Sequence, residues 1–544
     1  MAGKRVVLFG ASKMGKRTLE SWSPHLGPVL YFVDNDPDKW GGKLNELPIY
    51  APDVLVKEDL NDLLIIVTST YYDQIATQLE AMGMVEGLHF ATLEQALSSL
   101  VMNEPGSNLP KVRDRTDHRA VVLLMIPVGW FGLDYIRLKR ECDDAGIQCF
   151  FVSPPRRSNQ RVTLALTPQN FKQFRFNGVP LFAACRYNIC VSLKLSIDKL
   201  DSNNEHHWAS IIENMEQTAA YIRLADEVLQ TANPDIVLIP QGYTMESAVY
   251  RFLCVLQGLR LIAIENSLNA NRLIWDDQAG IAVNKIPARN YFWRWEELTD
   301  LKKAMEYVNW YLSSIKKLKQ AQHQSPEGAP NIENSKRPTI LYLANVLTDA
   351  SVMFNSRVGS QLEAIKATAR TAISHGYNFI LKIHPRERPG HSQVYQNLTL
   401  SALKQDDDFW QVISNSKDCY IDDSNKFDTY ALIQASDVCV TVCSQAGLEA
   451  LLLGKETVLL GDAYYGGLGF THDISHLSQL DQGISDALNP LRKRIDKVTI
   501  AHFFYIFDCL FSIEKSEHGV VELLLRTLGR RRHPLPTSNG QLGA

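Results

Sequence analysis

Short apolar runs rich in β-branched residues recur along this chain, and helical patterns separate them. In the N-terminal part, such runs occupy residues 6–10, 29–34 and 63–70. Runs of this kind are typical of strands buried on both faces of a parallel sheet, because helices cover both faces there. Helical patterns follow at residues 16–22 and 72–83, and the second ends on a glycine stop. The alternation predicts an α/β fold built from doubly wound parallel sheets.

Two further blocks repeat this alternation and are set apart by polar segments that contain proline and glycine. These segments, at residues 103–119 and 320–338, are predicted linkers. The strand patterns of the two later blocks lie at 120–127, 147–155, 234–242 and 259–267, and at 339–346, 379–385, 437–444 and 456–462. We therefore predict three domains, at residues 1–102, 118–318 and 336–525, in a chain of 544 residues. Two α/β domains joined by one linker are common in enzymes that close on a ligand between facing strand ends.

Composition narrows the class of protein. The formal net charge of −4 provides no overall attraction to nucleic acid, so no nucleic-acid partner is expected. The nine cysteines include no C-x-x-C pair, which argues against a disulfide framework and against structural zinc. We see no secretory leader, and the nearest candidate for a membrane span, residues 501–511, is short and contains Asp508. These features predict a cytoplasmic protein without a metal site.

Residues 440–467 place a turn and a helix directly after a strand pattern. The turn begins Ser444-Gln445, and the helix that follows presents free N–H groups and a partial positive charge, which favour an anion. Ser444 is placed to cap that helix or to donate its hydroxyl to a phosphate, and Gly447 would let the backbone approach a ligand closely. Glu449, expected in the first helical turn, could accept hydrogen bonds from both hydroxyls of a ribose. The alternative is that Ser444 is only a cap and Glu449 only a favourable first-turn charge.

A basic corner follows an earlier strand pattern of the same block. His384 comes where that strand ends, and ligands bind beyond the carboxyl ends of parallel strands. Pro385 prevents the strand from continuing and fixes the turn. His384 can donate a hydrogen bond to a phosphate oxygen, and Arg386 or Arg388 can add positive charge. His-Pro alone more often marks a surface turn, but here the turn and helix at Ser444 follow it in the same block. Together they predict a phosphate-binding site.

Residues 336–475 resemble the capsule polysaccharide biosynthesis family, which includes the Kdo transferases of bacterial capsule and lipopolysaccharide assembly. The resemblance is carried by LKIHPRE, by VTVCSQAGLEALLLGKETVLLGDAYYGGLGFTH and, more loosely, by ANVLTDASVM near Asp349. The chain departs from the family by reading GKET where GKPV is usual. It also has Cys443 where a small polar residue such as asparagine is usual. The first departure concerns the start of a strand, so it bears on packing more than on chemistry.

The resemblance implies a GT-B glycosyltransferase, with two Rossmann-like domains facing a cleft that holds a nucleotide-sugar donor, and no required metal. It implies that His384 and Ser444 contact the donor phosphate and that Glu449 contacts the ribose. The implied donor is CMP-Kdo or a related CMP-sugar. The implied acceptor is a saccharide or lipid-linked glycan of a growing capsule, lipopolysaccharide or other surface glycan. The whole chain would then be a small Rossmann-like domain followed by a two-domain GT-B enzyme.

The second block is the expected acceptor domain, and it resembles the first domain of that family more faintly. Glycosyl transfer needs a carboxylate near the anomeric carbon, as a base or to stabilise positive charge. The acids at expected strand ends or in loops are Glu265, Asp277, Asp276 and Glu246. We predict Glu265 as the catalytic carboxylate and Asp277 as the second choice, although each could be an ordinary solvated acid. In the third block, the acidic run at 406–408 indicates a solvated loop.

The N-terminal block is a second candidate for nucleotide binding. FGASKMG follows a strand pattern and opens a helix, but the dinucleotide fingerprint Gly10, Ser12, Gly15 lacks its middle glycine. Asp34 closes the second strand, where an acid that binds ribose is expected. Asp34 and Asp36 also match the D-x-D of metal-dependent transferases, but their place at a Rossmann strand end favours the ribose. The block resembles the small Rossmann-like domain ahead of various bacterial sugar-modifying enzymes, so it holds a nucleotide or is only structural or regulatory.

Two rival functions remain open. The first is an NAD(P)-dependent sugar oxidoreductase or epimerase that uses the N-terminal block, and the missing middle glycine counts against it. The second is a non-catalytic scaffold of polysaccharide assembly, and the intact set of His384, Ser444 and Glu449 counts against it. The basic tail at residues 530–532 could contact the inner face of the cytoplasmic membrane or the polysaccharide assembly machinery, or it is a frayed terminus.

Overall fold

The computed structural model describes most of the chain. The described residues are 4–12, 14–16, 18–20, 28–60, 62–69, 71–86, 88–93, 96, 120–124, 131–152, 162–277, 279–280, 300–315, 328, 336–388, 395–424, 426–491 and 496–529. The predicted linker at 103–119, most of the linker at 320–338 and the basic tail at 530–532 lie outside these residues.

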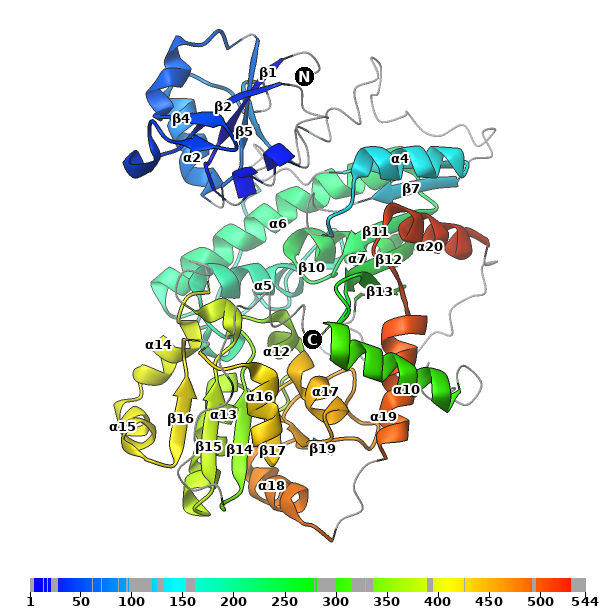
Figure 1. Ribbon diagram of the computed structural model, residues 1–544. Helices are drawn as coiled ribbons and strands as arrows, with labels where there is room; N and C mark the ends of the chain where they lie inside the picture. Colours follow the sequence, from blue (N-terminus) through cyan, green and yellow to red (C-terminus); the bar gives the residue numbers. More distant parts are fainter. Residues whose placement is uncertain are drawn as a thin grey trace. The chain divides into compact units, whose positions relative to one another are not determined.

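The predicted α/β class is confirmed. The described residues form three six-stranded sheets and a two-stranded ribbon, and the N-terminal block has a sheet of its own (Figure 1). The chain divides into two compact units, and their boundary passes through one strand of the second sheet. The first unit is Met1–Arg156, Asp226–Leu238 and Ser516–Arg532, and the second is Arg157–Ala225, Ile239–Lys515 and His533–Ala544. The boundaries of the three predicted domains stay a prediction.

The N-terminal sheet has the order β3-β4-β2-β1-β5-β6. Its central strand β1 pairs in parallel with β2 on one side and with β5 on the other. The chain therefore reverses its direction of travel across the sheet at β1, and ligands of doubly wound folds bind at such a reversal. The elements are β1 (Arg5–Phe9), β2 (Val29–Val33), β3 (Lys43–Leu44), β4 (Leu47–Tyr50), β5 (Leu63–Val67), α2 (Tyr72–Ala81) and β6 (Phe90–Thr92).

The second sheet is mixed and has the order β20-β13-β12-β11-β7-β8. Strands β7, β8 and β11 are parallel, whereas β12–β13 and β13–β20 are antiparallel pairs. Strand β20 comes from the C-terminal part of the chain, and this return was not predicted. The elements are β7 (Ala120–Leu124), α4 (Tyr135–Asp144), β8 (Ile147–Phe151), α5 (Leu181–Leu193), α6 (Glu205–Ala232), β11 (Ile236–Pro240), α7 (Met245–Gln257), β12 (Arg260–Asn266), β13 (Arg272–Asp276), β20 (Ser512–Glu514) and α20 (Glu517–Gly529).

The third sheet is entirely parallel, in the order β16-β15-β14-β17-β18-β19. The chain begins at the central strand β14, builds outward through β15 and β16, and then returns to build the other half from β17. The reversal between β14 and β17 is the expected ligand position of a doubly wound sheet. The strands are β14 (Thr339–Leu343), β15 (Asn378–Lys382), β16 (Cys419–Asp422), β17 (Val438–Thr441), β18 (Glu456–Leu459) and β19 (His472–Asp473). The helices are α12 (Ala350–Asn355), α13 (Gln361–Ser374), α14 (Leu398–Lys404), α15 (Asp407–Asn415), α16 (Thr429–Ala435), α17 (Gln445–Leu452) and α18 (Leu480–Leu488).

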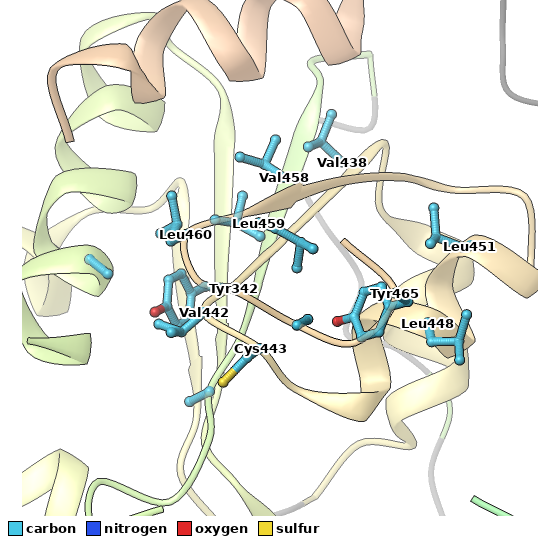
Figure 2. Close-up of a cluster of buried hydrophobic side chains, with 14 of the residues drawn as sticks. Tyr342, Val438, Val442, Cys443, Leu448, Leu451, Val458, Leu459, Leu460 and Tyr465 are labelled. Carbon is cyan, nitrogen blue, oxygen red and sulfur yellow. The ribbon is translucent and has the colours of Figure 1, made fainter. Parts of the chain in front are cut away.

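Helices cover both faces of the third sheet, which explains its continuous apolar strands. Ile340 and Tyr342 of β14 pack into one apolar cluster with residues of α13 and α18. Leu341 and Leu343 pack into another with residues of α16. Successive side chains of a strand point to opposite faces, so a strand covered on both sides must be apolar throughout. Figure 2 shows the first of these clusters around Tyr342 and Leu448, where β14 and β17 meet helix α17.

Residues 501–511 form a buried helical segment inside this fold. Helix α19 (Lys497–Tyr505) continues into one π-helical turn, η7 (Ile506–Leu510), and packs against α10 (Leu301–Trp310). The carboxylate of Asp508 accepts hydrogen bonds from the Tyr307 hydroxyl at 2.8 Å, from the backbone N–H of Asn269 at 3.3 Å and from the Ser267 hydroxyl. Burial raises the pKa of Asp508 above its ordinary value. Across the described ranges, no helix is long and apolar enough to span a membrane.

Candidate active site

The turn after β17 lies at the reversal point of the third sheet. Thr441 donates its hydroxyl hydrogen to the carbonyl of Leu343 at 2.8 Å, which ties the carboxyl ends of β17 and β14 together. Ser444 is the N-cap of α17, because its hydroxyl oxygen accepts from the backbone N–H of Ala446 at 3.3 Å. The predicted cap is confirmed. Because the hydroxyl oxygen of Ser444 is the acceptor in that bond, the hydroxyl can also donate its hydrogen, as a phosphate contact would require.

The position of Tyr465 explains why residue 447 is a glycine. A Cβ atom on Gly447 would lie 2.2 Å from the hydroxyl oxygen of Tyr465. That hydroxyl donates to the carbonyl of Ser444, and the Tyr465 side chain is fully buried. Figure 2 shows Tyr465 beside Leu448 of helix α17. The group that lies close to the backbone at this glycine is the protein's own phenol, and the predicted approach of a ligand stays a prediction.

We expect Gly447→Ala to lower the free energy of unfolding by about 1–3 kcal/mol, because a buried side chain must shift to admit the methyl group. Adding Tyr465→Phe should recover part of that loss by removing the clashing oxygen. Gly529→Ala is the matched control, since a Cβ atom there meets nothing within 4 Å. Denaturant unfolding of the wild type and of these three variants is the measurement. No recovery in the double variant would mean that the Tyr465 hydroxyl is not the cause.

Glu449 is held inside the domain by two tyrosines. Its Oε1 atom accepts hydrogen bonds from the hydroxyls of Tyr311 at 2.8 Å and of Tyr430 at 2.7 Å. Burial first, and the carboxylate second, raise the pKa of both phenols, so they remain protonated donors. The expected place in the first helical turn was wrong, because α17 begins at Gln445 and Glu449 therefore lies in the second turn. The contact with a ribose stays a prediction.

His384 begins the basic corner after β15. Its Nδ1 atom accepts a hydrogen bond from the backbone N–H of Arg386 at 3.1 Å, and Pro385 opens a short 3₁₀ helix, η5 (Pro385–Glu387). Because Nδ1 accepts, the neutral ring carries its hydrogen on Nε2, which is the atom that can donate to an anion. The side chain of His384 is half-buried and that of Arg386 is exposed. Strand β15 ends at Lys382, two residues before His384, and the strand does not continue past Pro385, as predicted.

Glu387, a buried carboxylate that sequence reasoning missed, holds this corner in place through hydrogen bonds. Glu387 is fully buried and accepts from the backbone N–H of Leu347 at 3.0 Å, and from the backbone N–H and hydroxyl of Thr399 at 2.8 and 2.9 Å. Burial raises the pKa of Glu387 above its ordinary value. Glu387 thus joins the loop after β14, the start of α14 and the basic corner. The E of the LKIHPRE motif is the sequence signal that could have indicated this role.

An ion pair anchors the end of β15 just before His384. The ammonium group of Lys382 contacts Asp422 Oδ2 at 2.5 Å and the carbonyl of Phe427 at 2.9 Å, and both charged side chains are buried. The carboxylate of Asp422 also accepts from the backbone N–H of Lys426 at 2.8 Å. Burial lowers the pKa of Lys382, although the neighbouring carboxylate opposes this. The end of β15, which His384 follows, is therefore joined to β16 by an ion pair.

The predicted catalytic acids differ in environment. Glu265 lies at the end of β12, and a Cβ atom on Gly280 would approach its Oε1 atom to 2.5 Å. Asp276 is buried and its Oδ1 atom accepts from the backbone N–H of Ala279 at 2.7 Å, which is a structural role. Asp277 is exposed, and Glu246 lies in the first turn of helix α7 rather than in a loop. The assignment of Glu265 as the catalytic carboxylate, with Asp277 as the second choice, stays a prediction.

Aromatic side chains link Glu265 to the third sheet. The rings of Tyr187 and Tyr243 meet edge to face with centroids 5.0 Å apart, and Tyr243 lies 6.5 Å from the ring of Phe354 on α12. Burial, and after it the charges of Glu265 and Asp349, raise the pKa of Tyr243. Asp349 caps α12 by accepting from the backbone N–H of Ser351 at 2.8 Å. The structure thus gathers Glu265 and Asp349 around a tyrosine pair.

Arg386 belongs to the same neighbourhood. Burial and the approach of Tyr395 and Asp349 raise the pKa of Tyr187, and Arg386 opposes this shift. A predicted catalytic acid and a predicted donor-binding residue therefore act on one tyrosine pair. Sequence reasoning missed Tyr187 and Tyr243, because their positions on α5 and after β11 carry no motif.

In the N-terminal block, the turn at residues 10–15 forms hydrogen bonds within itself and with Asp34. Asp34 accepts from the backbone N–H of Ala11 at 2.7 Å and pairs with Lys39 at 3.1 Å. A Cβ atom on Gly15 would lie 2.2 Å from the carbonyl of Gly10, so Gly15 serves tight packing. Gly10 has a φ of +118°, a conformation that favours glycine. Ser12 accepts from the Gly15 backbone N–H at 3.3 Å, so the residue in place of the middle glycine braces the turn.

Over the part of the chain that the structure describes, no group of three or more His, Cys, Asp or Glu side chains is arranged to hold a metal ion. The nine cysteines are free thiols, and seven of them are buried.

Two family models match the chain. Residues 293–505 match the model described as "Capsule polysaccharide biosynthesis protein", and residues 2–87 match the model described as "C2185-like, N-terminal". The first match contains the basic corner, the Ser444 turn and Glu449. No curated protein matches the chain.

Solved structures to which the chain is similar include two of KpsC from Thermosulfurimonas dismutans. The β-Kdo 2,7 transferase is 13% identical and has a TM-score of 0.38, with 75% of this chain and 100% of that chain covered. The β-Kdo 2,4 transferase is 17% identical and has a TM-score of 0.36, with 54% and 87% covered. UDP-GlcNAc 2-epimerase from Methanocaldococcus jannaschii is 13% identical and has a TM-score of 0.29, with 75% and 99% covered. As the motifs LKIHPRE and VTVCSQAGLEALLLGKETVLLGDAYYGGLGFTH predicted, residues 293–505 of this chain are similar to the capsule polysaccharide biosynthesis family, whose model they match.

Proposed function

We propose that this chain is a glycosyltransferase that moves a sugar from a nucleotide-activated donor to a growing capsule, lipopolysaccharide or other surface glycan. One observation carries the proposal. Within the segment that matches the capsule family, β15 and β17 flank β14, and the carboxyl ends of both flanking strands carry groups suited to a phosphate. These groups are His384 with Arg386 after β15, and the Ser444-capped end of α17 after β17.

In the proposed reaction, these groups stabilise the charge on the leaving phosphate. The Nε2 hydrogen of His384, the hydroxyl of Ser444 and the charge of Arg386 would contact its oxygens, and the Gln445 end of α17 would add the positive end of a helix dipole. Such donors lower the barrier most when the fold holds them in place beforehand. The Glu387 contacts and the Lys382–Asp422 pair support that requirement.

The carboxylate of Glu265 is the proposed base, with Asp277 as the second candidate. The acceptor hydroxyl oxygen would attack the anomeric carbon while its proton passes to Glu265. The bond from that carbon to the phosphate oxygen breaks, and the phosphate keeps the electron pair. A positioned carboxylate contributes typically about 10²–10⁴-fold to such a step. The proximity of Glu265, Asp349 and Arg386 to one tyrosine pair supports this assignment.

The proposed donor is CMP-Kdo or a related CMP-sugar, from the resemblance of the motifs. One histidine with one or two arginines suits a monophosphate, which carries fewer charges than a diphosphate. The proposed acceptor is a saccharide or lipid-linked glycan. The proposed location is cytoplasmic, with peripheral contact at the membrane or with the assembly machinery. The N-terminal domain would hold a nucleotide or act as a regulatory domain.

Calorimetric binding of CMP, UDP, GDP and NAD to the wild type and to His384→Ala tests the proposal. We expect CMP to bind the wild type and to lose at least about tenfold in affinity in the variant, because a hydrogen bond to a charged group is lost. His375→Ala is the matched control, since His375 is an exposed histidine of the same segment that pairs with Asp481 at 3.1 Å. It should bind CMP like the wild type.

The other outcomes separate the rivals. UDP or GDP binding with the same loss would keep the transferase and reject the CMP donor. NAD binding unaffected by His384→Ala would favour an oxidoreductase that uses the N-terminal domain. No nucleotide binding, and no nucleotide release from sugar donors in the presence of an acceptor, would favour the non-catalytic scaffold.

A further inference from the structure

Two arginines of the second unit carry charges that no described residue neutralises. Arg186 lies on α5 and Arg251 lies on α7, and both side chains are partly buried. The Nε atom of each is buried without a hydrogen-bond partner, and neither guanidinium forms an ion pair with any described residue. By contrast, Arg357 pairs with Asp462 at 3.0 Å and Arg337 with Asp418 at 2.9 Å.

Their contacts are with aromatic rings instead. The guanidinium of Arg186 lies over the ring of Phe354 at 4.3 Å, and that of Arg251 lies over the ring of Phe252 at 4.4 Å. Such contacts orient a guanidinium and cover one face, but they leave the N–H groups at its edge to find acceptors. An arginine in this state is prepared to bind an oxyanion through two parallel hydrogen bonds.

The two cations also act on each other. Burial first, and the charge of Arg186 second, lower the pKa of Arg251 to about 10, and Asp276 opposes the shift without forming an ion pair. Burial likewise lowers the pKa of Arg186. A buried charge without a partner is unfavourable, and two like charges near each other are more so. The fold therefore retains an arrangement that an anion would relieve.

The pair lies beside the candidate active site. Arg186 is adjacent in sequence to Tyr187, whose ring contacts that of Tyr243. The ring over which the Arg186 guanidinium lies belongs to Phe354 of α12, the helix that Asp349 caps. Helix α5 is held against the start of α7, because the side chain of Asn188 accepts from the backbone N–H of Met245 at 2.9 Å. The two helices thus hold Arg186 and Arg251 in the second block, which is the expected acceptor domain.

A second unsatisfied group precedes α7. Gln241 has a left-handed backbone with a φ of +58°, and its Oε1 atom is buried without a hydrogen-bond partner among the described residues. A Cβ atom on the next residue, Gly242, would lie 2.2 Å from the carbonyl of Ala279, so the loop is locked against the end of β13. Strained backbone and unpaired polar atoms are typical of ligand sites.

We propose that Arg186 and Arg251 form an oxyanion site that binds a carboxylate or a phosphate carried by the acceptor glycan. This inference rests on the proposed transferase function, because it assigns the anion to the acceptor. The chemistry shared by both sources is a compact oxyanion that accepts from two guanidinium groups. The neighbouring rings of Tyr187 and Tyr243 would contact the sugar that carries it.

Binding of glucuronic acid, of inorganic phosphate and of neutral glucose to the full chain tests the site by calorimetry. We expect one of the two anions to bind and glucose not to bind. Arg186→Gln and Arg251→Gln should each weaken that anion by about tenfold or more, since each removes charge-assisted hydrogen bonds. The matched control is Arg370→Gln, which removes an exposed arginine that lies 5.9 Å from the ring of Phe409. Preference for glucuronate or for phosphate identifies the source of the oxyanion.

Thermal unfolding without ligand separates a binding role from a structural one. Replacing an unpaired buried cation by neutral Arg251→Met should leave the midpoint unchanged or raise it. A lower midpoint together with unchanged anion binding would overturn the proposal. So would the absence of binding by either anion at millimolar concentration, or an equal loss in Arg370→Gln.

Nucleotide binding to the same variants keeps this inference distinct from the proposed function. The affinity for CMP should be unchanged in Arg186→Gln and Arg251→Gln, because neither residue is assigned to the donor. Anion binding that depends on both arginines, in a protein that binds no nucleotide, would support the site and reject the transferase. Nucleotide binding with anion affinity that is insensitive to both substitutions would reject the site alone.

Discussion

Lys382→Met should lower the free energy of unfolding at pH 7 by about 3–5 kcal/mol, as measured by denaturant unfolding, because it leaves a buried carboxylate without its cation. The side chain of Asp422 is buried, and the ammonium group of Lys382 forms an ion pair with it. The backbone N–H groups of Lys426 and Phe427 continue to donate to it, but they do not supply a full positive charge. Because His384 follows two residues later, we expect nucleotide binding to weaken as well.

The control for this prediction is a more exposed ion pair of the same sheet. Arg337 pairs with Asp418 at 2.9 Å near the starts of β14 and β16, with its side chain 47% exposed. Arg337→Met should cost no more than about 1 kcal/mol, because water solvates the remaining acid. The double variant Lys382→Met with Asp422→Asn should recover part of the loss by removing the orphaned charge. A cost for Lys382→Met no greater than that for Arg337→Met would contradict the buried-pair argument.

Glu387→Ala should lower the free energy of unfolding by about 2–4 kcal/mol and should weaken nucleotide binding. The substitution removes the acceptor for three donors from Leu347 and Thr399, and unsatisfied buried donors cost about 1–3 kcal/mol each before the site relaxes. The corner that carries His384 would then lose its attachment to the loop after β14 and to the start of α14. Glu387→Gln keeps one acceptor oxygen and should show a smaller loss of both properties.

The effect of Glu387 should also depend on pH. Burial raises its folded-state pKa above the ordinary value of 4.5, so the folded state binds the proton more tightly than the unfolded state does. The contribution of Glu387 to stability is therefore fully present below pH 4.5 and is lost as pH rises through the raised pKa. The difference in unfolding free energy between wild type and Glu387→Ala should be larger at low pH than at pH 7. Glu363→Ala, on the exposed part of α13, should show no comparable trend, and an equal trend would contradict the assignment.

Much of the fold could be predicted from local patterns. Strand runs such as that at 339–346 were recognisable because a parallel sheet covered on both faces needs apolar residues at every position, and β14 has that property. The cap at Ser444 and the strand end at Pro385 were equally local, since they depend on side-chain bonds and ring geometry within a few residues. The predicted loop at 406–408 was wrong, because Asp406 caps α15 and Asp407 begins it, but Asp407 and Asp408 are exposed to solvent as expected.

Local patterns were enough to predict the α/β class, the order of the blocks and the motifs that contain His384, Ser444 and Glu449. The groups that surround these three residues could be identified only from the folded chain. The buried partners of Glu387 and Glu449, and the return of β20 to the second sheet, join residues far apart in the chain. No local pattern encodes such contacts, because a buried charge or an edge strand is satisfied by whatever the fold brings to it. The unpaired state of Arg186 and Arg251 is of the same kind, since it is visible only when every neighbour is known.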